Sequence, residues 1–402
     1  MSKIILFNIP AAGHVNPSLP IVRELIARGE DVLYINTEDY RQKIEATGAS
    51  FIAYPDITSL IKLMEEDASE GNLPRNMRDL LRTTAKIMPF CIDLIESQKP
   101  DLVIFDTLCR WGYLVAKQTK TPNVSFCTTF VVRPTDMPPL PASAMLDIGS
   151  KMLKVLPSYI HDAWTMYREQ GIFPGFLLDA VMSTGDITLV FTSRDFQPKG
   201  EKYDDSYKFI GTSIATRIDE SDFPFDALSD KPMVYISLGT LAQNLNFLKL
   251  CFQAFADFDA QFILSAGKQT NLSDLGAIPD NFIVRNFVPQ LEILERADTF
   301  ITHAGMNSVQ EGLVYAVPML AVPHQTEQAF VALRLQVEGA GIALKTSPPF
   351  GDVSIAELQT GLRQILANPS YANNAKRLGE SLKNAGGYQR AADEIQGFIK
   401  RD

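Results

Sequence analysis

The chain is short of the residues that build disulfide frameworks and metal sites. Its 402 residues include only four cysteines and four histidines. The cysteines lie far apart, with no Cys-x-x-Cys pair and no neighbouring histidine to complete a zinc site. They are Cys91, Cys109, Cys127 and Cys251. We therefore expect buried free thiols in a reducing compartment and no structural metal.

Long apolar runs and clusters of positive charge are also missing. No apolar run approaches the roughly 20 residues that span a bilayer, and the N-terminus shows no signal-peptide pattern. The formal net charge is −10, a field that repels nucleic acid and anionic membrane surfaces. We expect a cytoplasmic protein, a monomer or a weak dimer, with no nucleic-acid or membrane partner.

What is present is a repeated alternation of short apolar runs with helical segments. The first set of apolar runs covers 3–9, 31–36, 50–54, 101–106, 124–129 and 187–192. The second set covers 233–238, 261–265, 282–285, 299–302, 319–322 and 342–344. Continuous apolar runs separated by helices indicate parallel sheets covered on both faces. The pattern predicts an α/β protein with two doubly wound domains facing across a ligand cleft.

The alternation also suggests where the domains begin and end. It stops at about residue 207, and we place the first domain at 1–212, a linker at 213–231 and the second domain at 232–385. Two inserted segments, 56–82 and 133–176, are rich in Met, Pro, Phe and Tyr. We expect them to be long irregular loops that form a wall for an apolar ligand.

Two residues of the first domain have the properties of a general base and its partner. His14 lies after the first strand and before the first helix, and Asp106 ends a strand on the same predicted sheet edge. A neutral imidazole can remove a proton from a hydroxyl group, and a carboxylate can fix its tautomer. The alternative is structural, since histidines occur in such turns and aspartates cap helices.

In the second domain, a strand end followed by a helix start predicts an anion site. The strand ends at Thr302, and the helix opens near Asn307 and Ser308. Such a helix start presents unpaired N–H groups and a positive dipole end to a phosphate. We expect Gly305 to let the phosphate approach and His303 to add a hydrogen bond or a positive charge. Ser308 is expected to cap the helix and contact phosphate oxygen.

Other residues of this domain suit the rest of a nucleoside diphosphate sugar. Phe287 could stack on a base while the backbone of Val288 reads its edge. Glu311 could accept the ribose hydroxyls, and Glu327 and Gln328 the sugar hydroxyls. Each residue taken singly has a structural explanation, but together they predict a donor site.

These segments resemble the donor-binding signature of the UDP-glycosyltransferase family, and the whole chain is similar to its bacterial macrolide-glycosyltransferase branch. The matching segments are Phe287-Val-Pro-Gln290, Thr302 to Ser308, Pro323 to Gln328, Gly13-His-Val-Asn-Pro17, Ser237-Leu-Gly-Thr240 and Gly386-Gly-Tyr388. The resemblance implies a GT-B fold of two Rossmann-like domains, a UDP-sugar donor, most often UDP-glucose, and inverting stereochemistry. It also implies that a C-terminal helix, 386–402, packs back on the first domain.

By the same resemblance, the family's catalytic pair maps onto His14 and Asp106. Its donor contacts map onto Gln290, Asn307 and Thr240, and onto the hydroxyls of Thr128 and Thr129. Two positions depart from the plant form of the signature, with Phe287 in place of a Trp and Glu327 in place of an Asp. The choices between UDP and TDP and among hexoses stay open.

The sequence thus predicts an inverting transfer of a hexose from UDP-glucose to a hydroxyl of a small apolar acceptor, such as a macrolide, a flavonoid or another phenolic. No Asp-x-Asp motif accompanies the donor site, so we expect no metal and no cofactor beyond the donor. The alternatives are a nucleotide-sugar epimerase or hydrolase of the same plan, and a non-enzymatic nucleotide-sugar binder. A nicotinamide dehydrogenase is disfavoured because Gly-x-Gly-x-x-Gly is absent after the first strand of either domain.

Overall fold

The chain divides into two compact units. The computed structural model describes residues 1–55, 57, 73–132, 142–175, 182–213, 223–239, 244–347 and 351–400. One unit comprises Met1–Ile214 with Ala385–Asp402, and the other comprises Ala215–Asn384. The unit boundary falls within the predicted linker, 213–231, of which 214–222 lie outside the described residues.

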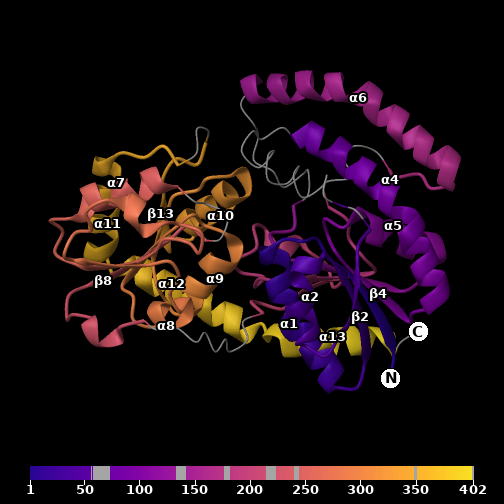
Figure 1. Ribbon diagram of the computed structural model, residues 1–402, viewed down its shortest axis with the longest axis horizontal. Helices are drawn as coiled ribbons and strands as arrows, with labels where there is room; N and C mark the ends of the chain where they lie inside the picture. The colour runs from indigo at the N-terminus through magenta and orange to yellow at the C-terminus, as the bar shows by residue number, and fades with distance from the viewer. Residues whose placement is uncertain are drawn as a thin grey trace. The chain divides into compact units, whose positions relative to one another are not determined.

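The sheet of the first unit (Figure 1) consists of parallel strands. It has seven of them, in the order β3-β2-β1-β4-β5-β6-β7. They are β1 (Lys3–Phe7), β2 (Asp31–Asn36), β3 (Ser50–Ala53), β4 (Leu102–Asp106), β5 (Asn123–Cys127), β6 (Ile187–Val190) and β7 (Tyr207–Phe209). The first six coincide with predicted runs. The strand β7 was not predicted, because three residues are too few to show a pattern beside the linker.

Helices cover both faces of this sheet, as the continuous apolar strands require. Alternate residues of β1 point to opposite faces, so Ile4 and Leu6 join one core while Ile5 and Phe7 join the other. The first core is closed by α1 (Ala12–Ala27) and α13 (Gly387–Ile399), which pack together. The second core lies beneath α4 (Leu73–Gln98), α5 (Arg110–Thr119) and α6 (Ala142–Gln170).

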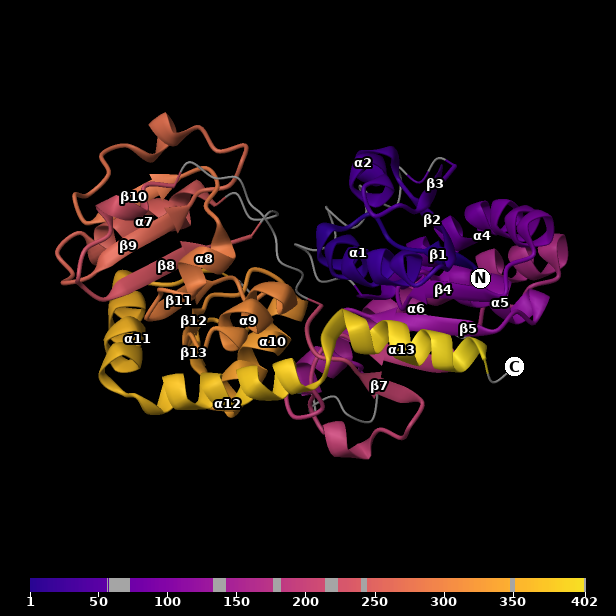
Figure 2. The same cartoon turned by 90° about the horizontal axis from the view of Figure 1, so that it is seen from below.

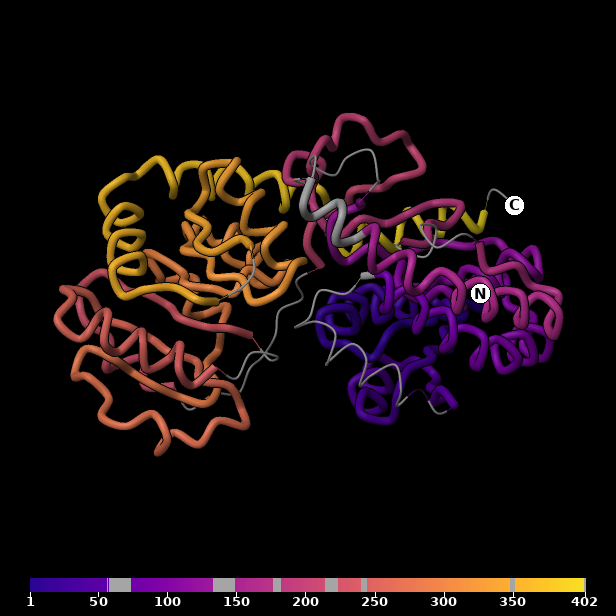
Figure 3. Tube along the Cα trace, turned by 90° about the horizontal axis from the view of Figure 1, so that it is seen from above, coloured from indigo at the N-terminus to yellow at the C-terminus, as the bar shows by residue number. Residues whose placement is uncertain are grey.

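The last helix of the chain belongs to the first unit although it follows the second unit in sequence (Figure 3). It begins after Gly386, whose φ of 97° is left-handed backbone that suits glycine. The backbone N–H of Gly387 donates to Ile210. Arg28, the residue that follows α1, then bonds Asp393 at 2.6 Å. The end of the chain is thereby attached to the unit that contains its beginning.

The second unit repeats the plan with six parallel strands in the order β10-β9-β8-β11-β12-β13 (Figure 2). They are β8 (Met233–Ser237), β9 (Gln261–Ser265), β10 (Phe282–Arg285), β11 (Thr299–Thr302), β12 (Met319–Ala321) and β13 (Gly341–Ala343). Its helices are α7 (Leu245–Phe255), α8 (Gln290–Leu294), α9 (Met306–Val314), α10 (Thr326–Val337), α11 (Ile355–Ala367) and α12 (Ser370–Asn384). In each sheet the strand order reverses once, between β1 and β4 and between β8 and β11, where open α/β sheets bind ligands.

The prediction of long irregular loops at 56–82 and 133–176 was wrong for the parts that the structure describes. A 26-residue helix, α4, starts at Leu73, and a 29-residue helix, α6, fills most of the second segment. Pro157 lies inside α6, and the Met, Pro, Phe and Tyr residues of the two segments hid the helical spacing of their apolar residues. In α6 that spacing is plain in its buried residues Val155, Tyr159, Ala163 and Met166. The stretches 58–72 and 133–141 lie outside the described residues.

Among the described residues, no helix has both the length and the hydropathy needed to cross a bilayer.

Two helical glycines provide a matched test of packing. In α12, which packs on α9, a Cβ at Gly379 would overlap the carbonyl oxygen of Leu313. At Gly397 in α13 an added Cβ would meet nothing within 4 Å. Gly379→Ala should therefore destabilise the protein by about 1–3 kcal/mol, whereas Gly397→Ala should be neutral or stabilise it by up to about 1 kcal/mol. Thermal denaturation of both variants checks this, and equal melting temperatures would contradict the packing.

Candidate functional site

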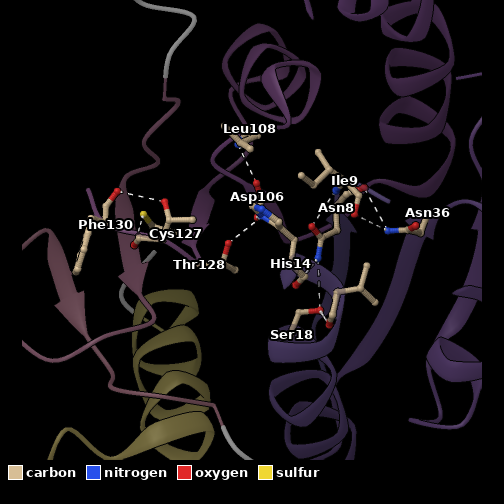
Figure 4. Close-up of polar contacts among 12 residues, drawn as sticks. Asn8, Ile9, His14, Ser18, Asn36, Asp106, Leu108, Cys127, Thr128 and Phe130 are labelled. Carbon is tan, nitrogen blue, oxygen red and sulfur yellow. Dashed lines mark hydrogen bonds and ion pairs between the residues drawn. The ribbon is translucent and has the colours of Figure 1, made fainter. Parts of the chain in front are cut away.

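The first candidate site lies where the strand order of the first sheet reverses. His14 sits in the first turn of α1, just after β1, and Asp106 is the last residue of β4. The sequence analysis placed His14 before the helix rather than in its first turn. The strands β1 and β4 are neighbours, with Phe7 opposite Phe105. Parallel pairing therefore brings both residues to one edge of the sheet (Figure 4).

His14 and Asp106 are joined by a short hydrogen bond. The distance from imidazole Nδ1 to carboxylate Oδ2 is 2.6 Å, and the side chains are 13% and 1% exposed. The other carboxylate oxygen, Oδ1, accepts the backbone N–H of Leu108 at 2.9 Å. An ionised carboxylate only accepts hydrogen bonds, so Nδ1 is the nitrogen that donates to it, and in a neutral imidazole this leaves the lone pair on Nε2. This is the tautomer that a general base needs.

The two threonines after β5 have different partners. Thr128 Oγ1 lies 2.8 Å from His14 Nδ1, the nitrogen that also faces Asp106. Thr129 Oγ1 donates to the carbonyl of Phe130 at 3.3 Å. The sequence analysis assigned both hydroxyls to the donor. The hydroxyl of Thr128 therefore contacts the imidazole, whereas the hydroxyl of Thr129 bonds the carbonyl of the residue that follows it.

A buried polar cluster beneath the turn was missed by the sequence analysis (Figure 4). The side-chain amide of Asn8 donates to the carbonyl of His14 at 3.2 Å and to the hydroxyl of Tyr34 at 2.7 Å. Ser18 Oγ lies 2.7 Å from the same tyrosine hydroxyl and donates to the carbonyl of Val15. Burial raises the pKa of Tyr34, so its hydroxyl stays protonated. The signal was an asparagine at the end of an otherwise apolar strand.

In the second unit, the corresponding position holds the predicted anion turn. The strand β11 ends at Thr302, and Gly305 is the N-cap of α9 in extended conformation. Ser308 lies inside the helix, so the prediction that it caps the helix was wrong. Asn307 and Ser308 both belong to the first turn. A glycine cap has no side chain to accept the first-turn N–H groups, which suits an anion in that place.

The imidazole of His303 lies against two glycine backbones. A Cβ at Gly239 would come within 2.7 Å of its Cε1, and a Cβ at Gly305 within 2.5 Å of its Nε2. Both positions therefore need glycine to make room for the ring, a reason the sequence analysis did not give. Burial, with a smaller contribution from His324, lowers the pKa of His303 to about 4. Of the two predicted contributions, the hydrogen bond is compatible with a neutral ring and the positive charge is not.

Glu311 and Gln290 meet in the structure. Gln290 Nε2 donates to Glu311 Oε2, and Gln290 Oε1 accepts the hydroxyl of Tyr235 at 3.0 Å. Glu311 is only 3% exposed, and a carboxylate so deeply buried needs such partners. Tyr235 was missed, because inside an apolar strand it looked like an ordinary core residue.

The remaining predicted donor residues differ in exposure. Phe287 is 42% exposed, with Lys268 Nζ 5.2 Å from its ring centroid, while Val288 is buried. Glu327 is exposed in the first turn of α10. Gln328 is buried, and its Oε1 accepts the backbone N–H of His324 at 2.8 Å. The position of Thr240 lies outside the described residues.

Comparison with known proteins identifies relatives of the whole chain. The family model described as "UDP-glucoronosyl and UDP-glucosyl transferase" matches residues 214–384. The uncharacterized UDP-glucosyltransferase YojK of Bacillus subtilis is 35% identical, over 100% of this chain and 98% of its own. The oleandomycin glycosyltransferase of Streptomyces antibioticus is 31% identical, over 98% of this chain and 90% of its own.

Solved structures show the same fold. The glycotransferase of kitacinnamycin has a TM-score of 0.83 and 26% identity, covering 99% of both chains. The calicheamicin glycosyltransferase CalG4 has a TM-score of 0.77 and 24% identity, covering 100% of this chain and 99% of its own. The predicted GT-B architecture, two parallel-sheet α/β domains, is confirmed.

The lowered pKa of His303 makes a prediction about stability. The folded pKa, about 4, lies below the ordinary value of 6.5. Below pH 6.5 the unfolded chain therefore binds a proton that the folded one does not. This residue should remove up to about 3 kcal/mol of stability as the pH falls from 6.5 to 4. Denaturant unfolding of the wild type and His303→Gln across this window checks the effect, and identical pH slopes would contradict it.

Proposed function

The chain belongs to the UDP-glucoronosyl and UDP-glucosyl transferase family, in its bacterial branch, and from that premise we propose how this glycosyltransferase works. It transfers a hexose, glucose from UDP-glucose, to a hydroxyl of a small apolar acceptor with inversion at the anomeric carbon. The observation that carries the proposal is the 2.6 Å bond between His14 and Asp106. It holds the imidazole in the tautomer of a base.

In the proposed reaction, the acceptor hydroxyl gives its proton to Nε2 of His14 while its oxygen attacks the anomeric carbon. The new carbon–oxygen bond forms as the bond to the diphosphate breaks, and the diphosphate leaves with the electron pair. Asp106 stabilises the imidazolium that results. Its burial favours this role, because a charge in a low dielectric interacts strongly with its neighbour.

The second unit is proposed to hold the donor. The N–H groups of the first turn of α9 and the neutral ring of His303 would bind the diphosphate and stabilise the charge that it gains. Phe287 would stack on the base, and Glu311, oriented by Gln290, would accept ribose hydroxyls. We propose that no metal takes part, since helix end and imidazole supply the stabilisation.

The acceptor class is proposed from the relatives and from composition. The oleandomycin glycosyltransferase acts, by its name, on a macrolide. We therefore propose macrolides as the first acceptors to test, with flavonoids and other phenolics beside them. Release of UDP from UDP-glucose that requires an acceptor would support the transferase, whereas release without one would favour a hydrolase. Product mass would identify the hexose, and added EDTA should leave the rate unchanged.

Replacing the proposed base should abolish turnover but not donor binding. We expect His14→Ala to lower kcat by roughly 10²–10⁴, with Asp106→Asn also strongly impaired. His161→Ala, at an exposed histidine of α6, is the matched control and should keep wild-type activity. The dissociation constant of UDP should stay within about twofold of the wild-type value in all three variants, because none of them removes a proposed hydrogen bond to UDP. Retained turnover in His14→Ala would remove the base assignment.

Thr128 separates two interpretations of its hydroxyl. If it positions the imidazole, as its 2.8 Å distance to Nδ1 suggests, Thr128→Val should lower kcat about threefold to tenfold and leave the KM for the donor unchanged. Thr128→Ser should restore most of the rate. If the hydroxyl binds the donor, the valine variant should raise the KM for UDP-glucose instead. Initial-rate kinetics over both substrates decide between them.

A further inference from the structure

The helix α6 has a large apolar stripe on its outer face. Along it the side chains follow one another at intervals of three or four residues, which keeps them on one side of a helix. These side chains and their exposed fractions are Leu153 (72%), Leu156 (37%), Ile160 (58%), Trp164 (60%) and Tyr167 (49%). We call these five residues the outer stripe. So many exposed large apolar side chains in one row mark an interaction surface.

The outer stripe is separate from the face that packs α6 into the protein. The buried face contains Val155, Tyr159, Ala163 and Met166, and it packs on α4 (Figure 1). Successive residues turn by about 100° around a helix, which places the outer stripe about a quarter-turn from that face. The helix is thus apolar on two sides, and only the buried side packs against the rest of the unit.

A row of basic residues borders the outer stripe on the side away from α4. Lys154, His161 and Arg168 follow one another at seven-residue intervals and are exposed. Seven residues are close to two helical turns, so these side chains stay in line. Asp162 points elsewhere, because it bonds Arg82 at 2.7 Å. Lys154 and Arg168 supply the positive charge of this row. Glu169 lies 3.7 Å from Arg168, and among the described residues no carboxylate lies within salt-bridge distance of Lys154.

We propose that α6 lies flat on a lipid surface that contains anionic headgroups, with the outer stripe in the interface and the basic row over the phosphates. Leucine and isoleucine flanked by tryptophan, tyrosine and cations are the composition of interfacial helices. The rings of Trp164 and Tyr167 lie side by side, with centroids 6.1 Å apart. Both would sit at headgroup level, where an apolar ring with a polar tip is most stable.

The acidic net charge of the chain, −10, does not prevent this contact. Charges are screened over a Debye length of about 8 Å at physiological ionic strength. A headgroup beneath α6 is therefore affected mainly by the basic row. From the sequence, a membrane partner was not expected because of the net charge and the missing clusters of positive charge. Neither describes this face, where helical geometry aligns residues that lie seven positions apart.

A second copy of the chain would fit the outer stripe less well. If two α6 helices paired antiparallel about His161, Lys154 of one copy would lie near Arg168 of the other. Like charges in line along such a seam repel. The basic row therefore favours an anionic partner over a second copy.

The surface would also bring the enzyme to its acceptors, since apolar hydroxylated molecules concentrate in bilayers. That consequence rests on the proposed function, whereas the lipid contact does not. Binding to vesicles requires neither donor nor acceptor, so its failure and a failure of glycosyl transfer would be seen in different experiments.

The chain contains a built-in probe of this contact. It has two tryptophans, of which Trp111 is fully buried and Trp164 is 60% exposed. On adding vesicles of phosphatidylcholine with phosphatidylglycerol to the full-length protein, we expect a blue shift of the emission and quenching by brominated lipids. Vesicles of phosphatidylcholine alone should bind at least about tenfold more weakly, given about 1 kcal/mol for each basic residue near the surface. An unchanged spectrum and no co-sedimentation would overturn the proposal.

Variants distinguish lipid binding by the outer stripe from nonspecific binding elsewhere on the protein. Ile160→Asp should abolish vesicle binding, and Lys154→Glu with Arg168→Glu should remove the preference for anionic lipid. Val337→Asp, at a 75% exposed valine of α10, is the matched control and should bind as the wild type does. Circular dichroism and acceptor-dependent activity in detergent-free buffer confirm that each variant is folded.

Light scattering tests whether a second copy of the chain covers the outer stripe instead of lipid. We expect a monomer in the absence of lipid. A stable dimer that Ile160→Asp dissociates would show that a second copy covers the outer stripe, and would overturn the lipid proposal.

Discussion

The hydrogen bond between His14 and Asp106 depends on the reversal of strand order in the first sheet. The two residues are 92 positions apart, and only the pairing of β1 with β4 brings their strand ends together. Asp106 is buried, so its charge must be satisfied locally. Its two oxygens accept hydrogen bonds from Nδ1 of His14 and from the backbone N–H of Leu108. The proton on Nδ1, and with it the chemistry available at Nε2, follows from that requirement.

The second unit has a histidine at the same topological position, in different surroundings. Its reversal, between β8 and β11, brings the turn at Gly239 to the turn at His303 and Gly305. Close backbone packing keeps the imidazole neutral, since burial lowers its pKa. The two histidines thus differ in surroundings: one faces a carboxylate, and the other faces glycine backbone. That difference suits one to proton transfer and the other to hydrogen bonding.

Support for the proposed base extends further than the catalytic pair. Asn8, Ser18 and Tyr34 form a buried cluster that fixes the carbonyl groups of the first turn of α1, on which His14 is mounted. Buried polar groups that are fully hydrogen-bonded hold a local backbone in one conformation. The imidazole is therefore positioned from below by this cluster and at Nδ1 by Asp106 and Thr128.

The sequence by itself determined the α/β class, twelve of the strands, and the strand ends after which His14 and His303 follow and at which Asp106 lies, because strand ends and apolar runs are local patterns. Only the tertiary structure decided which of these residues meet. The pairing of Gln290 with Glu311 and of Thr128 with His14 depends on long-range strand order, which has no local signal. The helices α4 and α6 were hidden by the irregular composition of their segments, with Pro157 inside α6, and packing against each other stabilises them. The outer face of α6 could be separated from its buried face only once that packing was known, because both faces are apolar in sequence.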